Sequence, residues 1–401
     1  MIAAAVGRLR PGPLTEADLR AHIWPLFSRV LEYVGKPIYL ANHSLGRPLD
    51  RTADDIAAGV ATWYRDMNEA WDPWMEAQRR FRELTAQLIN APRADCIVPK
   101  TAAGQGLRAV LNALPGKPRV VATGGEFDSL DFILRTWRDK GRIDLTLVPA
   151  RPDGGFDAAD IAHAIAPGTT LVVVSSVMFR TGQVLGGLNE LIRRAHALGA
   201  KVLVDVYHGA GVIPTDVQAI DADFAVGGSY KYLRGGPGAC WLYVRPDHLD
   251  ALRTLDTGWF AKKDVFAYQR PEPPEYAPGG DGWNESTPPV FAPYQSLAGL
   301  EFTLAIGVGR LREYSLSLQA RLKDLLLQQG IEAEGAREDR GAFVTVRHAR
   351  AAEIASELND RGVHTDARGE YLRLCPDILN PDAEVAEAAR RVGEAVRSLG
   401  R

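Results

Sequence analysis

Short apolar runs alternate with helical patterns through the middle of the chain, between residues 95 and 245. Seven runs of three to five residues have the length and the aliphatic, β-branched composition of buried strands. They lie at 96–98, 120–122, 145–148, 171–174, 202–206, 224–226 and 240–244. Between most of them, apolar residues recur with a helical period at 104–114, 128–140, 157–166 and 187–198. This alternation predicts an α/β fold in which a mostly parallel, seven-stranded sheet is covered by helices.

The N-terminal part of the chain predicts helices. After an initial loop, Thr15 has the residue type of a helix N-cap, and a short amphipathic helix is expected from there toward Val34. A brief apolar stretch follows at 38–40. Residues 52–90 predict two long helices with a stripe of tryptophan, tyrosine and phenylalanine, which we assign to the core or to a subunit interface.

The alternation of strands and helices stops after residue 246. The stretch 269–289 is rich in proline and glycine, which predicts an ordered functional loop. A long helix is expected from about 293 toward Gly330, and a smaller α/β unit follows it. The elements of that unit are expected at 342–347 (strand), 351–361 (helix), 371–374 (strand) and 382–399 (helix).

These patterns divide the chain into three parts. Residues 1–55 form an N-terminal arm that contributes to a small domain. Residues 56–292 form a large α/β domain with a protruding loop at 258–290. Residues 293–401 form a connecting helix and the small C-terminal α/β domain.

Composition narrows the class of protein. The 401 residues are 46% hydrophobic and 24% charged, values typical of a globular protein of this size. The net charge of −3 indicates neither a nucleic acid nor an anionic membrane as partner. No secretion signal or membrane span is recognisable, so the cytoplasm is the expected location. Cys96, Cys240 and Cys375 lie far apart, without metal-ligand spacing or a disulfide framework.

The residues that follow each run are the candidates for chemistry, because ligands bind at the carboxyl ends of the strands in such sheets. Ala102 and Ala103 open a helix whose free N–H groups could hold a phosphate, although a plain helix start explains them equally well. Phe127 follows the second run, where its ring could stack on a flat ligand or pack in the core. Ser175 follows the fourth run and could contact a ligand or cap a turn.

Two charged residues at strand ends are more specific. Asp205 ends an apolar strand, where a buried carboxylate needs a partner, and His208 follows three residues later. Lys231 lies in a glycine-rich bend between the last two runs. A buried lysine loses its charge easily and is then a nucleophile toward carbonyl carbon; a surface lysine beside a tight turn is the alternative. Together, these residues suit pyridoxal 5′-phosphate, a phosphorylated pyridine aldehyde, held as a Schiff base.

The same residues carry a family resemblance over nearly the whole chain. Residues 39–46 (YLANHSLG) are similar to the N-terminal turn YLDGNSLG of kynureninase, and residues 229–239 (SYKYLRGGPGA) to its lysine segment SYKYLNGGPG. Further matches lie at 175–183, 258–260 and 286–289. The sequence thus resembles the class V, fold type I pyridoxal phosphate enzymes, and within them kynureninase.

The resemblance implies a fold like that of the fold type I transferases, with a defined cofactor site. Lys231 would form the Schiff base and move protons together with Tyr230. Asp205, assisted by His208, would pair with the pyridine nitrogen. The other cofactor contacts would come from Ala102, Ala103, Phe127, Ser175 and Tyr230, and from Trp259 and Thr287 of a neighbouring subunit.

The resemblance also implies a substrate side. Arg373 would bind the α-carboxylate of an amino acid, with Arg368 as the competing candidate and a surface arginine on an edge strand as the alternative. His43 and Ser44, in the N-terminal turn, would contact the substrate as well. The expected assembly is a homodimer with active sites at its interface.

Four positions depart from the kynureninase pattern. Leu130 stands where an aspartate is expected, although Asp131 is adjacent. Met178, Arg234 and Lys262 replace a polar residue, an asparagine and a histidine. The cofactor set is therefore nearly complete, while the substrate side is changed.

The implied reaction is the hydrolytic carbon–carbon cleavage of kynurenine or a related aryl-keto amino acid to alanine and an aromatic acid. A class V aminotransferase, β-lyase, desulfurase or epimerase is the alternative on the same cofactor, and a non-catalytic binding protein is the third. A desulfurase needs a cysteine on a mobile loop. Cys375 is poorly placed for that role, because it lies between the expected strand at 371–374 and Pro376.

Overall fold

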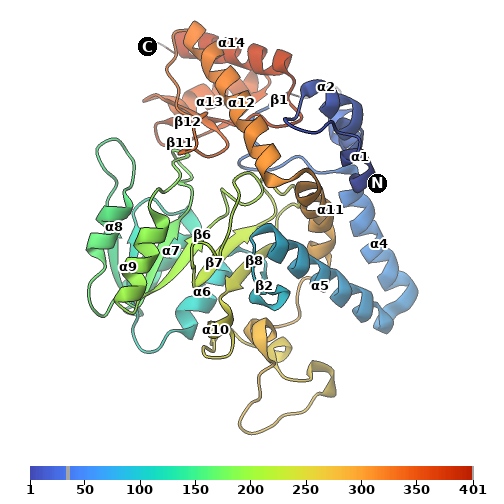
Figure 1. The fold of residues 1–401 in the computed structure, drawn as a ribbon, viewed down its shortest axis with the longest axis vertical. Helices are drawn as coiled ribbons and strands as arrows, with labels where there is room; N and C mark the ends of the chain where they lie inside the picture. Colours follow the sequence, from blue (N-terminus) through green and yellow to red (C-terminus); the bar gives the residue numbers. More distant parts are fainter. Residues whose placement is uncertain (33–36, 400–401) are drawn as a thin grey trace.

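A seven-stranded sheet forms the centre of the computed structural model, which describes residues 1–32 and 37–399 (Figure 1). Its strand order is β2-β8-β7-β6-β5-β3-β4. The strands are β2 (Ile97–Lys100), β3 (Arg119–Thr123), β4 (Asp144–Val148), β5 (Leu171–Ser175), β6 (Lys201–Asp205), β7 (Phe224–Gly228) and β8 (Cys240–Val244). Strands β3 to β7 pair in parallel, whereas β8 is antiparallel to both β7 and β2. The expected mostly parallel sheet is therefore confirmed, with one reversed strand.

Helices cover this sheet. α6 (Ala103–Ala113) packs on α7 (Asp128–Asp139), and α8 (Ala158–Ala164) packs on α9 (Leu188–Ala197). Strands β5, β7 and β8 are buried along their whole length, so their sequences are continuously apolar rather than alternating. Each helix follows or precedes a strand as the sequence pattern indicates.

The helices that flank the sheet domain differ in part from the expectation. α4 (Asp50–Asp66) and α5 (Trp71–Leu88) confirm the two helices expected at 52–90, and both pack against α11 (Phe291–Ile306). The prediction of a single long helix from 293 is wrong, because the chain forms two helices there, α11 and α12 (Val308–Gln328). Gly307 lies at the break with a φ of 92°, a conformation that glycine tolerates and that no helix contains.

The N-terminal segment is less regular than expected. Its elements are α1 (Ile2–Val6), α2 (Glu16–Asp18), a π turn (Leu19–Ile23), a 3₁₀ turn (Trp24–Phe27) and α3 (Ser28–Leu31). The initial residues are thus helical rather than a loop. Thr15 caps α2 as predicted, since its side chain accepts a hydrogen bond from the Asp18 amide at 3.2 Å. Pro25 lacks a backbone N–H and therefore interrupts the helix expected after Thr15. Val34, the expected end of that helix, lies outside the described residues.

The C-terminal part forms a smaller sheet with its own apolar core. Its elements are β9 (Val344–Arg347), α13 (Ala351–Asp360), β10 (Val363–His364), β11 (Asp366–Arg368), β12 (Tyr371–Leu374) and α14 (Asp382–Ser398). β12 lies between β11 and β9, antiparallel to both. The N-terminal strand β1 (Ile38–Tyr39) pairs in parallel with β10, so the arm reaches this unit. Strands β10 and β11 were not expected, and the boundaries given above for the three parts stay a prediction.

The loop after β8 has little regular structure. It contains α10 (Pro246–Leu249) and three 3₁₀ turns at Trp259–Ala261, Val265–Ala267 and Gly279–Trp283. In Figure 1 it extends from the lower end of the molecule, away from the smaller C-terminal unit. Within the described residues, no helix has the length and apolar character needed to cross a membrane.

A buried ion cluster ties the N-terminal arm, the bend after β7 and the C-terminal unit together. Asp377 pairs with Arg47 and, at 2.8 Å, with Arg234. The side chains are 13%, 10% and 7% exposed, respectively. Arg234 has a φ of 58°, which is unusual for an arginine, and its guanidinium lies over the rings of Phe27 and Phe302. Two guanidiniums thus depend on one carboxylate.

Asp377→Asn is expected to lower the free energy of unfolding by about 3 kcal/mol, because it leaves two buried guanidiniums without their counter-charge. Asp382→Asn is the matched control: its pair with Arg321 is 57% and 45% exposed, so less than about 1 kcal/mol is expected. Urea denaturation of both variants measures the difference. Equal losses in the two variants would show that the buried cluster adds nothing.

Candidate active site

A cavity of about 140 Å³ lies at the carboxyl ends of the central strands. Eight of the ten residues predicted to bind the cofactor line it. They are Ala102, Ala103, Phe127, Ser175, Asp205, His208, Tyr230 and Lys231. The side chains come from the ends of β2, β3, β5, β6 and β7, where the rule for parallel sheets places a ligand.

Lys231 is buried at the centre of this cavity, with 4% of its surface exposed. Its Nζ lies 2.6 Å from Nε2 of His208 and faces the rings of Tyr207 at 4.7 Å and Phe127 at 5.1 Å. Burial lowers the pKa of the Lys231 amine, although the charge of Asp205 opposes the shift. The surface-loop alternative for Lys231 is therefore wrong, and a neutral, nucleophilic amine is favoured.

The N-terminal turn holds the bend that carries Lys231. Gly46 donates its amide to the carbonyl of Tyr230 at 2.7 Å. A Cβ on Gly46 would collide with the carbonyl of Lys231, so only glycine permits this approach. The resemblance at 39–46 thus concerns a segment that positions the lysine.

Asp205 ends β6 and is 5% exposed. Its Oδ1 accepts a hydrogen bond from the Tyr207 amide at 2.8 Å, and no cation of the described residues forms an ion pair with it. Burial raises the pKa of its carboxyl group, whereas the Tyr207 amide and the charge of Lys231 lower it. A buried carboxylate is costly without a cationic partner, so Asp205 is suited to a cationic ligand. His208, expected beside Asp205, forms its hydrogen bond with Lys231 instead.

The rest of the cavity wall includes two aromatic rings and the N-terminal end of a helix. Phe127 contacts Phe179 edge to face, with ring centroids 5.4 Å apart, and both line the cavity. Ala102 is the N-cap of α6, whose first turn presents backbone N–H groups near the cavity. This end of the cavity is suited to an anion.

Ser175 leads to a residue that sequence reasoning missed. Its Oγ donates to Oε2 of Glu126 at 2.6 Å, and Oγ1 of Thr123 donates to Oε1 at 2.5 Å. Glu126 is 3% exposed. Its position directly before Phe127, at a strand end, was the available signal.

Arg373 is buried on the middle strand β12, so the alternative of a surface arginine on an edge strand is wrong. Its guanidinium donates to both carboxylate oxygens of Asp366, at 2.8 and 2.6 Å, and to the carbonyl of Phe179 at 2.6 Å. These contacts use three of the five N–H donors of an arginine, which leaves two for a ligand. Asp366 is a further residue that the sequence analysis did not single out.

His43 and Ser44 lie on the same carboxylate. His43 Nε2 lies 2.9 Å from Oδ1 of Asp366, and Ser44 Oγ donates to Oδ2 at 2.7 Å. Burial opposes the ionisation of Asp366, but His43 and Arg373 hold the pKa of its carboxyl group well below its usual range. His43, Ser44 and Arg373 are not among the residues that line the cavity, and His43 and Ser44 contact Asp366 directly. Their contact with a substrate stays a prediction. Arg368 has a single ion pair with Asp366, at 3.3 Å, and is more exposed.

Trp259 and Thr287 do not line the cavity of their own chain. They contact each other, since Trp259 Nε1 donates to Thr287 Oγ1 at 3.1 Å in the protruding loop. Lys100, at the end of β2, anchors this loop by its ion pair with Glu285 at 2.8 Å. Their place in the loop leaves them available to another subunit.

The positions that depart from the kynureninase pattern have structural roles. Leu130 and Met178 are buried in the main core. Asp131, the neighbour of Leu130, pairs with Arg135 on the surface of α7 and does not line the cavity. Lys262 donates to the carbonyl of Gln269 within the protruding loop.

The three cysteines are all buried and reduced. Cys375 donates from Sγ to the carbonyl of Ala342 at 3.1 Å, and burial raises the pKa of its thiol. Cys240 lines the cavity, but its pKa is also raised, to about 11. None of them is an exposed thiolate on a loop.

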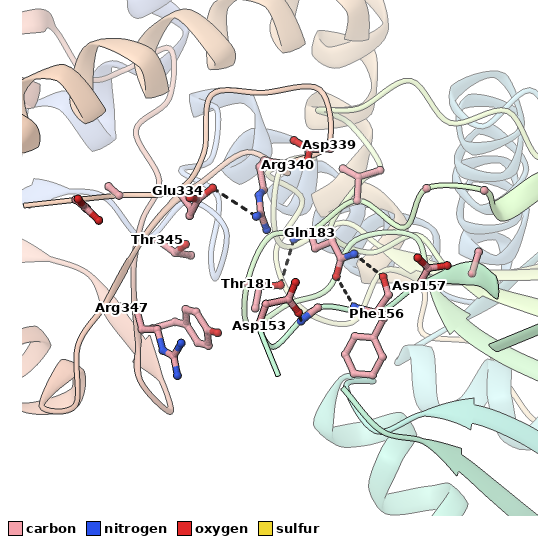
Figure 2. Close-up of a pocket in the computed structure, with 18 of the residues that line it drawn as sticks. Asp153, Phe156, Asp157, Thr181, Gln183, Glu334, Asp339, Arg340, Thr345 and Arg347 are labelled. Atoms are coloured by element: carbon pink, nitrogen blue, oxygen red, sulfur yellow. Dashed lines mark hydrogen bonds and ion pairs between the residues drawn. The ribbon is translucent and has the colours of Figure 1, made fainter. Parts of the chain in front are cut away.

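A larger hollow lies elsewhere, between the C-terminal unit and the loops near α8 and α9 (Figure 2). Its volume is about 1500 Å³, and its lining includes Asp153, Asp157, Glu334 and Arg340. Figure 2 shows Glu334 paired with Arg340 and Gln183 bonded to the backbone of Phe156. Because these polar groups already have protein partners, the smaller cavity at Lys231 is the better candidate for chemistry.

Comparison with known proteins places the chain. Residues 49–380 match the aminotransferase class-V family. The chain is 28% identical to kynureninase from Bacillus cereus over 361 residues, which cover 85% of this chain and 84% of the relative. It is 29% identical to kynureninase from Deinococcus radiodurans over 365 residues, covering 86% and 84%. It is also 28% identical to the uncharacterized aminotransferase YcbU from Bacillus subtilis over 351 residues, covering 86% and 90%.

Solved structures give the same fold. A C-DES mutant with glycine covalently linked to its PLP cofactor has a TM-score of 0.83 at 18% identity, covering 92% of this chain and 99% of that protein. The cysteine desulfurase CsdA from Escherichia coli has a TM-score of 0.79 at 19% identity, covering 96% and 100%. With the match over 49–380, these likenesses identify the fold and the family: the chain belongs to the class-V aminotransferase family of pyridoxal phosphate-dependent enzymes.

Proposed function

We propose that the cavity at Lys231 holds the pyridoxal 5′-phosphate. The residues present fit its functional groups. The neutral amine of Lys231 suits the aldehyde carbon, and Asp205, a buried carboxylate without a cation, suits a protonated pyridine nitrogen. The N-terminus of α6 suits the phosphate, and Phe127 offers its ring to the flat pyridine.

The reaction that we propose is hydrolytic carbon–carbon cleavage of kynurenine or a related aryl-keto amino acid. The observation that carries it is the likeness to kynureninases over 84% of their length, with Lys231 and Asp205 in one cavity and Arg373 near enough for its charge to lower the pKa of Lys231. When bound, the cofactor supplies an electron sink for the substrate α-carbon. Lys231 and Tyr230 move protons beside it, because both line the cavity.

Arg373 would bind the substrate α-carboxylate with its two remaining N–H donors. The two hydrogen bonds to Asp366 fix the plane of the guanidinium, and His43 and Ser44 contact Asp366 in turn. Such a chain of hydrogen bonds holds an arginine in one orientation before the substrate arrives. Arg368, whose guanidinium is more exposed and pairs with Asp366 only at 3.3 Å, is the weaker candidate.

We further propose a homodimer in which Trp259 and Thr287 of the partner subunit complete the phosphate site. Both residues lie on the protruding loop and not in their own cavity. Several large apolar side chains near this loop and on α4 are exposed, which favours burial against a second copy. They are Trp63, Tyr64, Met67, Phe266 and Tyr268.

An aminotransferase is the second candidate, favoured by the likeness to YcbU. A desulfurase is disfavoured, because the three cysteines are buried and none has the exposure that sulfur transfer needs. The products formed from the substrate distinguish hydrolytic cleavage from transamination.

Incubation with L-kynurenine tests the proposal. Hydrolysis releases anthranilate, followed by its fluorescence, and alanine in equal amount, without a keto-acid acceptor. A requirement for pyruvate, with conversion of the cofactor to its amine form, would identify an aminotransferase instead. No anthranilate at high enzyme concentration, from protein loaded with cofactor, would rule out kynurenine cleavage.

A further inference from the structure

Glu126 is a buried carboxyl group directly behind the wall of the cofactor cavity. It lies in the turn between β3 and α7, where a Cβ on Gly125 would collide with the ring of Phe156, so the turn is tightly packed. No cation of the described residues forms an ion pair with Glu126. Its carboxylate oxygens accept hydrogen bonds from the hydroxyl groups of Thr123 and Ser175. An apolar side chain of similar size would cost less free energy to bury here, so the presence of a carboxyl group indicates a function.

Ser175 connects this carboxyl group to the cavity. A serine hydroxyl has one hydrogen, and Ser175 spends it on Glu126, so it can only accept a hydrogen bond from a ligand. Ser175 lines the cavity and is the register partner of Asp205 in the neighbouring strand. Two buried carboxyl groups therefore flank one hydroxyl group.

We propose that Glu126 is a positioning residue, which sets the direction of the Ser175 O–H bond and thereby decides whether Ser175 accepts or donates a hydrogen bond at the cofactor. With Glu126 ionised, both hydroxyl groups donate to it and Ser175 presents a lone pair to the cavity. With Glu126 protonated, its O–H can donate to Ser175, whose own hydrogen is then free for the ligand. The inference rests on the cofactor site proposed above and does not depend on the substrate.

The charges around Glu126 place both states within reach. Burial and, to a lesser extent, the charge of Asp205 raise the pKa of its carboxyl group, whereas the hydrogen bonds from Ser175 and Thr123 lower it. The net result is a pKa of about 7. A change at Asp205, the partner proposed for the pyridine nitrogen, is therefore transmitted to Glu126. The Ser175 hydroxyl reports that change back to the cavity.

A double-mutant cycle tests the inference, with the dissociation constant and the absorbance maximum of pyridoxal phosphate as readouts and no substrate present. Glu126→Leu is expected to weaken cofactor binding about three- to tenfold, the effect of one hydrogen bond, and to shift the absorbance maximum. In the Ser175→Ala background the same substitution should change binding less than twofold, because its effect passes through Ser175. Thr123→Val, which removes the other hydroxyl group but no lining residue, should stay within twofold.

Equal effects of Glu126→Leu in both backgrounds, or no effect in either, would overturn the proposal. Should Glu126→Leu fail to fold, Glu126→Met, which has nearly the length of glutamate but no strong acceptor for the Ser175 hydrogen, carries the same cycle with the same criterion. Because no substrate is present, these outcomes are independent of whether the enzyme cleaves kynurenine.

Discussion

Lys231→Ala is expected to abolish the absorbance band of covalently held cofactor and to lower turnover roughly 10⁴-fold, because one amine both binds the cofactor and moves protons. Lys231 is the only lysine among the residues that line the cavity. Its burial disfavours the charged form of the amine, and no ion pair within the described residues offsets this effect. The absorbance spectrum and the rate of product release measure the two effects.

Lys100→Ala is the matched control. Lys100 is also buried and also ends a strand of the central sheet, but it pairs with Glu285 and donates to the carbonyl of Trp283 at 3.1 Å. Its substitution should loosen the protruding loop and leave the absorbance band in place. Loss of the band in Lys100→Ala, with retention in Lys231→Ala, would exchange the two assignments.

Asp205→Ala is expected to lower turnover about 10²- to 10³-fold, the usual effect of removing one preorganised electrostatic contact. The cofactor-free protein should not become less stable, because the substitution removes a buried carboxylate that has no cationic partner. Turnover and the thermal midpoint of the cofactor-free protein measure the pair of effects. A lower thermal midpoint of the cofactor-free Asp205→Ala variant would mean that Asp205 stabilises the fold.

Asp223→Ala should have the opposite profile. Asp223 is 1% exposed and already has partners, since it lies 2.6 Å from His248, 2.8 Å from His196 and 3.0 Å from Arg245. Removing it leaves those groups unpaired, so the protein is expected to lose stability with little change in turnover. The contrast separates a carboxylate that waits for a ligand from one that holds the fold.

The parts predictable from sequence are those set by local pattern. Short apolar runs located all seven strands, most of them buried and parallel, although β4 is partly exposed and β8 is antiparallel. The strand-end rule then led to Asp205 and Lys231. The break at Gly307 was missed because apolar residues continue on both sides of it and no proline marks the end of a helix there.

The polar partners behind the site were not predictable. Glu126 contacts Ser175, 49 residues away along the chain, and Asp366 contacts His43, 323 residues away. Such contacts depend on how the strands and the N-terminal arm assemble, and a single sequence carries no periodic signal for them. The residues of the cavity wall were therefore found, while those that orient them were not.

Peptide mapping after borohydride reduction tests most directly whether Lys231 holds the cofactor. Reduction fixes pyridoxal phosphate to the lysine that binds it, and mass spectrometry of the digested protein then locates the added group. We predict that it is found on the peptide that contains Lys231 and on no other. Its attachment to Lys100 or to another lysine, or its absence from protein saturated with cofactor, would contradict the assignment.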